Sequence, residues 1–165
     1  MESLGKVTRS DDGRYTIRFI RRFAATPREV WAALTERDAL DGWLGRVRFE
    51  GVTGSALTVD FGAGVEIRGV VVEWEPLHKF SFTWLETAEP SAESLVSFEL
   101  FREGKGTRLT LVHTRQPTTM ARTTAGGWHA HLDLLNGFLE GTTPHWDAVY
   151  APAKAAYAAT VASIR

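Results

Sequence analysis

Apolar and polar residues alternate along the first two thirds of the chain, a spacing typical of β-strands that bury one face. Short turn-forming segments, such as 62–64 and 103–106, separate the alternating stretches, and strands joined by such turns run antiparallel. The strands predicted from this alternation cover residues 15–19, 47–49, 57–61, 65–74, 80–84, 96–100 and 109–115.

Helical signals interrupt the alternation at residues 26–43 and replace it from residue 128 onward. Thr26, Pro27 and Glu29 form a capping box at the start of a short helix. A second short helix covers 39–43. From residue 128 the apolar spacing becomes 3.6 residues, which predicts a long helix that ends at Gly141 and a terminal helix after it. The stripe of the long helix is formed by Trp128, Leu132, Leu135 and Leu139.

Three segments lack a clear period. Residues 1–13 are polar and are expected to form a flexible tail. Ile20 breaks the alternation of the first strand, so a bulge is expected near Arg21 and Arg22. Residues 116–126 are rich in threonine and are expected to be irregular.

The order of elements predicts an α+β fold. A curved antiparallel sheet of about six to seven strands wraps around the long C-terminal helix, and two short helices follow the first strand. The apolar stripe of the helix needs a surface to cover it, and the apolar face of the sheet is the available one. With no internal repeat or linker, residues 14–165 are expected to form a single domain.

The order and spacing of several local strings resemble the START-like helix-grip (SRPBCC) superfamily. Within it, the chain is similar to the family of the activator of heat-shock-protein-90 ATPase C-terminal-like domain, over roughly residues 14–141. The strings are TPREVWAAL (26–34), WLG (43–45), GVVVEWEP (69–76), FSFTW (80–84), GTRLTLVH (106–113) and GGWH (126–129). The resemblance implies a cavity between sheet and long helix, which relatives use for lipids, polyketides, hormones and other apolar ligands. The eukaryotic chaperone activator has an additional N-terminal domain, for which this chain has no room.

The aromatic content bears on such a cavity, because the chain has nine Phe, six Trp and three Tyr. Rings from three strands and the long helix are expected to converge, either filling the interior or lining a pocket for an apolar or aromatic ligand. The candidate ligand-binding residues are Trp43, Phe82, Trp84, Phe98, Leu111, His113, Trp128 and Leu132.

His113 is also the candidate catalytic residue. It lies in register with Leu109 and Leu111, so it is expected to face the interior. One interpretation is a core histidine hydrogen-bonded to a neighbour, and the other is a polar anchor or acid–base group whose pKa burial has lowered.

The string His129-x-His131-x-Asp133 is weak evidence for a metal. On a helix only His129 and Asp133 are neighbours, and two ligands do not make a zinc site. A solvated pair and no metal are therefore expected. Arg21, if it points inward, must meet a carboxylate.

Composition and charge narrow the classes of function and partner that remain. Nineteen basic and twenty acidic residues give a net charge of −1, which does not favour nucleic acid as a partner. No stretch is long and apolar enough to span a membrane, and no nucleotide-binding, Walker or nucleophile-elbow motif calls for a cofactor. The chain has no cysteine and no signal peptide, consistent with the cytoplasm. A monomer or a homodimer paired through the terminal helix is expected.

Three functions follow from these observations. The favoured one is binding of a small apolar or aromatic molecule, including lipids, without catalysis. The second is an enzyme acting on an apolar substrate, such as a cyclase, dehydratase or hydrolase. The third, implied by the family resemblance alone, is a co-chaperone-like or stress-response partner of heat-shock protein 90.

Overall fold

The structure is a computed structural model that describes residues 3–117, 120–162 and 164. Its helices are α1 (Pro27–Thr35), α2 (Arg37–Asp41), α3 (Ala121–Glu140) and α4 (Trp146–Ala162), with a short 3-10 helix, η1, at Pro90–Ala92. Its strands are β1 (Lys6–Arg9), β2 (Tyr15–Phe23), β3 (Arg46–Arg48), β4 (Ala56–Asp60), β5 (Glu66–Glu75), β6 (Lys79–Trp84), β7 (Ser94–Glu103) and β8 (Gly106–Gln116).

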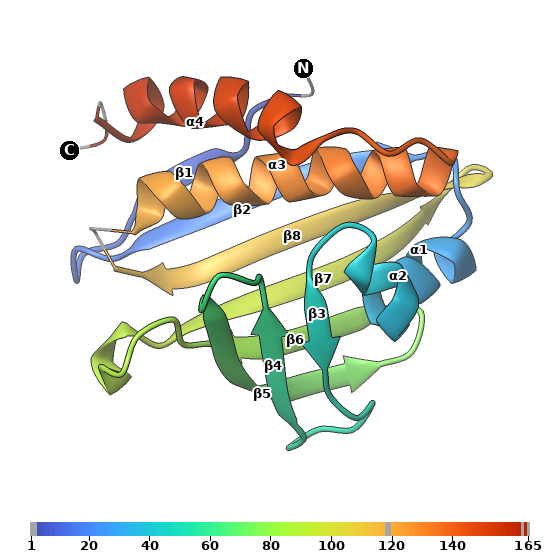
Figure 1. Ribbon diagram of the computed structural model, residues 1–165, viewed down its shortest axis with the longest axis horizontal. Coiled ribbons are helices and arrows are strands. Elements are labelled where there is room, and N and C mark those ends of the chain that lie inside the picture. Colours follow the sequence, from blue (N-terminus) through green and yellow to red (C-terminus); the bar gives the residue numbers. More distant parts are fainter. Residues whose placement is uncertain (1–2, 118–119, 163, 165) are drawn as a thin grey trace.

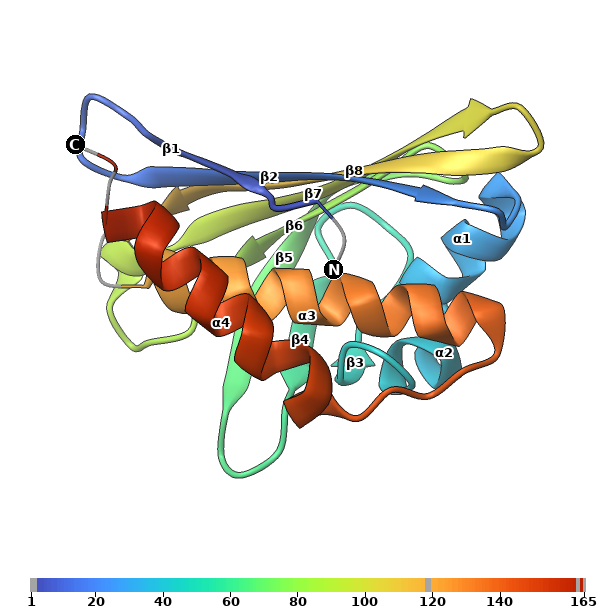
Figure 2. The same cartoon turned by 90° about the horizontal axis from the view of Figure 1, so that it is seen from above.

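The strands form one antiparallel sheet in the order β1-β2-β8-β7-β6-β5-β4-β3. Helix α3 lies along one side of the sheet, and α1 and α2 lie near one of its ends (Figure 1). Seen from above, α4 crosses α3 diagonally, from the side away from the sheet at its beginning toward β1 and β2 at its end (Figure 2). The predicted α+β helix-grip fold is confirmed, with eight strands among the described residues instead of six to seven.

The additional strand is β1, at Lys6–Arg9, within the segment for which the sequence predicts a flexible tail. It pairs antiparallel with β2, Val7 opposite Ile17. Val7 is buried in the core, and the Gly5 N–H donates a hydrogen bond of 2.6 Å to the Tyr157 hydroxyl. Backbone pairing and one apolar side chain hold this strand, so it has almost no periodic signal in the sequence.

The irregularity in β2 lies between Tyr15 and Ile17, so the prediction of a bulge at Arg21 and Arg22 is wrong. The strand keeps its alternation through Ile20, which faces outward at 39% exposed, and Arg21, which faces inward at 4% exposed. Arg21 Nη1 donates to the carbonyl oxygens of Ser3 and Ile20 at 3.0 and 3.2 Å, so hydrogen bonds offset much of the cost of burying its charge.

Helix α3 begins at Ala121, within the segment that the sequence predicts to be irregular. Thr123, Thr124 and Gly126 are weak helix formers, which hides the first turns from a propensity argument. Burial of Ala121 and Ala125 shows that tertiary packing holds these turns. No helix of the described chain has the length and apolar character needed to cross a membrane.

Candidate functional site: an aromatic pocket beside helix α3

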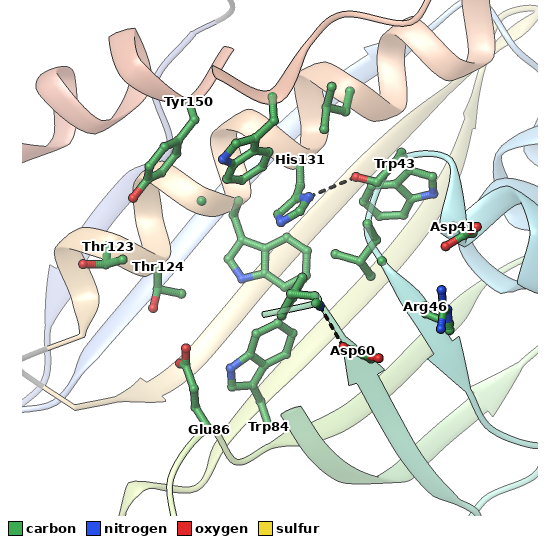
Figure 3. Close-up of a pocket in the computed structure, with 18 of the residues that line it drawn as sticks. Asp41, Trp43, Arg46, Asp60, Trp84, Glu86, Thr123, Thr124, His131 and Tyr150 are labelled. Atoms are coloured by element: carbon green, nitrogen blue, oxygen red, sulfur yellow. Dashed lines mark hydrogen bonds between the residues drawn. The ribbon is translucent and has the colours of Figure 1, made fainter. Parts of the chain in front are cut away.

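A pocket of about 830 Å³ opens between α3, the start of α4, the loop that follows α2 and the ends of β4 and β6 (Figure 3). Its volume is in the range of sites for small organic molecules. The described lining residues are Asp41, Gly42, Trp43, Leu44, Gly45, Arg46, Asp60, Phe61, Gly62, Trp84, Glu86, Met120, Thr123, Thr124, Gly127, Trp128, His131, Leu134, Trp146 and Tyr150. We call this space the aromatic pocket.

Seven of its described lining residues carry rings. The centroids of Trp84 and Trp128 are 5.4 Å apart, and His131 lies 6.1 Å from Trp128. On the other side of His131, the Trp146 ring is 4.6 Å away and stacks on Tyr150 at 4.9 Å. A continuous path of ring contacts therefore runs from the sheet across α3 to α4, from Trp84 at 8% exposed to Trp146 at 37% exposed.

His131 is the neutral polar group of the wall. Its Nδ1 lies 3.0 Å from the carbonyl oxygen of Trp43 (Figure 3). Because a carbonyl oxygen can only accept, Nδ1 carries the hydrogen and Nε2 is left as an acceptor. Burial lowers the pKa of His131 to about 4, although the hydrogen bond to Trp43 acts in the opposite direction. The ring is therefore uncharged at neutral pH.

Acidic side chains surround the mouth. Asp41, Asp60 and Glu86 line the pocket together with a single arginine, Arg46. Asp60 Oδ1 accepts a 2.7 Å hydrogen bond from the Gly62 N–H, which holds the loop after β4. In Figure 3, Glu86 reaches up beside Trp84 on the side of the pocket opposite Asp41 and Arg46. Among the described residues, the mouth of the pocket therefore has more negative than positive side chains.

Glu86 and Trp84 form the polar corner of the pocket. Desolvation raises the pKa of the Glu86 carboxyl, and the Trp84 N–H, acting on that carboxyl, lowers it in part. Trp84 is buried, and its Nε1 has no acceptor at regular hydrogen-bond geometry in the described residues. A ligand that enters this corner meets a carboxylate and an indole N–H side by side.

Three of the predicted ligand-binding residues, Trp43, Trp84 and Trp128, line the aromatic pocket. The other five lie deeper, between the sheet and α3, and are almost fully buried: Phe82, Phe98, Leu111, His113 and Leu132. The rings do converge, as the sequence predicts: Phe98 is 5.8 Å from Trp128 and 6.2 Å from Phe82. The inner rings fill the interior, and the outer ones line the pocket.

His113 belongs to the filled interior. Trp128 Nε1–H donates to its Nδ1 at 2.9 Å, so the neutral ring carries its hydrogen on Nε2. That atom lies 2.7 Å from Ser94 Oγ, which can accept the bond, and 2.6 Å from the Gln116 side-chain amide. Burial lowers the pKa of His113 to about 3. The ring therefore has the orienting partners that acid–base catalysis requires. It does not line the pocket, however, so it lacks access to a substrate there.

His129 belongs to a second buried polar cluster, so the prediction of a solvated pair with Asp133 is wrong. Its Nδ1 lies 2.9 Å from the Tyr157 hydroxyl and 3.3 Å from Arg21 Nη2, and its Nε2 lies 3.6 Å from Asp133 Oδ2. Burial, followed by the charge of Arg21, lowers the pKa of His129 to about 4. The cluster links β2, α3 and α4. No group of three potential metal ligands occurs within the described residues.

Phe61, Trp146, Tyr150 and Glu86 were not among the predicted site residues. Trp146 and Tyr150 lie on the terminal helix, which the sequence pairs with the sheet or with a second copy, and in the structure they cover the pocket. His131 could have been predicted as a site residue, because it lies three residues after Trp128 and so on the same side of the helix.

An open antiparallel sheet that holds a long C-terminal helix, with a pocket beside that helix, defines a helix-grip protein. The chain belongs to the family described as "Activator of Hsp90 ATPase homolog 1-like protein", which it matches over residues 24–140. No curated protein matches the sequence.

Solved structures show the same fold. The crystal structure of CalU16 from Micromonospora echinospora is 25% identical, with a TM-score of 0.79 over 96% of this chain and 98% of that one. DynU16, a protein of the dynemicin biosynthetic locus, is 26% identical, with a TM-score of 0.71 over 78% of this chain and 48% of that one. The Aha1 dimer from Colwellia psychrerythraea is 22% identical, with a TM-score of 0.66 over 76% of this chain and 96% of that one, and shows likeness of fold alone.

Proposed function

We propose that the protein binds a small organic molecule with at least one ring in the aromatic pocket. The observation that carries this proposal is the composition of the wall: Trp43, Trp84, Trp128 and Trp146 border a space of about 830 Å³. Flat aromatic faces with a few polar groups are typical of sites for ring-bearing ligands. The family fold and the origin of DynU16 in the dynemicin biosynthetic locus support a small molecule as the ligand.

Gly127 provides a direct test because it lines the pocket on α3, and a Cβ added there meets nothing within 4 Å. Gly127→Leu therefore places a side chain in the cavity without removing any wall residue. Gly127→Ala is the matched control, with the same backbone change and little added bulk.

The measurement is calorimetric and fluorescence titration of the full chain with three tricyclic probes: acridine, 9-aminoacridine and acridine-9-carboxylate. We expect at least one probe to bind and to quench the tryptophans. Gly127→Leu should weaken that binding by about tenfold or more, since a bound ring and the leucine compete for one space, whereas Gly127→Ala should retain most of it. Failure of all three probes to bind, or equal binding by Gly127→Leu, contradicts the proposal.

An enzymatic role finds no support at His113, which is sealed from the pocket by its own partners. Activation of the heat-shock-protein-90 ATPase, a stress-response role and lipid binding stay predictions that rest on the family. An ATPase assay with the chaperone, with and without this protein, tests the first. We also keep the cytoplasm as the expected location, which fractionation of cells would test.

The oligomeric state stays open between monomer and homodimer, and light scattering after size-exclusion chromatography decides it. One structural neighbour is described as a dimer. In this chain the aromatic residues of α4 have intramolecular roles, because Trp146 and Tyr150 line the pocket and Tyr157 is buried. These roles favour the monomer over pairing through α4.

A further inference from the structure

The charges at the pocket mouth bear on the class of ligand. Three carboxylates line the pocket, whereas Arg46 is the one basic side chain among its described lining residues. Arg46 is exposed and lies on β3 directly opposite Asp60 of β4, so a carboxylate already stands beside it. In Figure 3, Glu86 lies on the other side of the pocket from Arg46.

Glu86 is the polar group best placed to face a bound ring. It lines the pocket next to Trp84, and among the described residues no ion pair involves it. Among the described residues, the influences on its pKa are desolvation, which raises it, and the Trp84 N–H, which lowers it, with no described cation among them. Glu86 is exposed to solvent, and a carboxylate that no described basic group neutralises attracts a cationic ligand.

The walls favour the same charge. The faces of indole rings attract cations, tryptophan most strongly of the aromatic side chains, and Trp84 and Trp128 lie with centroids 5.4 Å apart beside Glu86. His131 is neutral and presents an acceptor nitrogen, which suits a ligand N–H donor. An anionic ligand would meet three carboxylates and one basic side chain among the described lining residues.

We propose that the ligand of the aromatic pocket is a ring compound that carries a protonated amine, with Glu86 as its countercharge and the indole faces as its walls. This inference rests on the proposed function and narrows it to a substrate class. An aromatic or polycyclic amine meets these requirements, whereas a fatty acid or another carboxylate does not.

The three acridines test this class because they share one ring system and differ in charge. 9-Aminoacridine is a cation at neutral pH, acridine is neutral and acridine-9-carboxylate is an anion. We expect the affinity for the full chain to fall in that order. Each step should be roughly three- to tenfold, the size of a cation–π contact or a partly exposed ion pair.

Glu86→Gln isolates the carboxylate. We expect it to weaken 9-aminoacridine binding roughly two- to fivefold and to leave acridine binding unchanged. Glu93→Gln is the matched control, because Glu93 is exposed in the segment before β7 and does not line the pocket. It removes the same charge from the same part of the chain and should change neither affinity.

The outcomes separate the two proposals. If the acridines bind with equal affinity, if the carboxylate binds best, or if Glu86→Gln and Glu93→Gln behave alike, the amine inference is wrong and ring binding stands. If none of the three binds, the proposed function itself fails. Circular dichroism of each variant confirms that a loss of affinity is not a loss of fold.

Discussion

The buried histidine His113 makes a quantitative prediction about acid stability. Its pKa is about 3 in the folded protein because burial removes the charged form from water, while an unfolded chain returns it to the ordinary value of 6.5. Between these two values the unfolded state binds a proton that the folded state does not. Lowering the pH below 6.5 therefore stabilises the unfolded chain, and the free energy of unfolding falls.

The magnitude follows from this linkage. Each pH unit below 6.5 costs about 1.4 kcal/mol for one histidine until the folded pKa is reached. From pH 7.5 to pH 5, His113 alone should lower the free energy of unfolding by about 2 kcal/mol. A typical domain has about 5–15 kcal/mol in total, so the loss should be readily measurable. His129 and His131, with pKa values lowered to about 4, change the stability in the same direction.

Urea unfolding followed by tryptophan fluorescence at pH 7.5, 6.5, 5.5 and 5 measures this dependence. His113→Gln keeps a side chain that can accept the Trp128 N–H but does not titrate. It should be less stable at pH 7.5, yet lose about 2 kcal/mol less than the parent on going to pH 5. His78→Gln, at an exposed position in the turn after β5, should follow the parent. Equal losses in the parent and His113→Gln would refute the reasoning.

Two further predictions concern α3 and the N-terminal segment. Gly127→Ala should raise the stability by about 1 kcal/mol, because alanine favours the helix and its Cβ has free space. Gly126→Ala should lower the stability instead, since its Cβ would lie 3.2 Å from the Lys154 Cα and force α4 outward. Thermal unfolding of both variants should therefore give shifts in melting temperature of opposite sign. Shifts of the same sign contradict this packing. Tyr157→Phe should cost about 1–2 kcal/mol, because the buried Gly5 N–H loses its acceptor; urea unfolding with no loss of stability would show that this N–H has another partner.

Much of the fold is predictable from the sequence because its signals are local. At α1, the Thr26 N–H donates to Glu29 Oε2 at 2.7 Å and the Glu29 N–H to Thr26 Oγ1 at 3.3 Å, the capping box expected from the residue types alone. The strands follow from a two-residue period, and the order from β3 to β8 follows from short turns that leave antiparallel pairing as the simple solution, whereas the pairing of β2 with β8 has no local signal.

The errors arise where a local rule competes with tertiary packing. Ile20 breaks the apolar pattern, and the sequence interpretation attributes this to a bulge. The strand instead continues with Arg21 inside, because partners from Ser3 and His129 are available to the guanidinium. Those partners lie far along the chain or in the N-terminal segment, so no window of sequence around β2 contains them.

The position of the site was the least predictable feature, since it depends on how much space side chains leave. Phe82, Phe98 and His113 were reasonable candidates, because each faces the interior. Helix α3 carries Leu132 and Leu135 along its central part, and there the interior is filled. Whether a set of rings fills or lines a space depends on packing in three dimensions, which residue types alone do not determine.

The composition of the first turns of α3 explains why the pocket lies where it does. Thr123, Thr124 and Gly127 are small and line the cavity together with the rings of Trp84 and Trp128. Larger residues at these positions would fill the space, as the leucines do further along the helix. The same small residues make this part of α3 resemble a loop in the sequence, so the feature that hides the helix start also creates the cavity. Gly127→Leu tests this argument independently of any ligand: it should close the pocket while the protein remains folded. If the protein unfolds instead, the space beside Gly127 is not free.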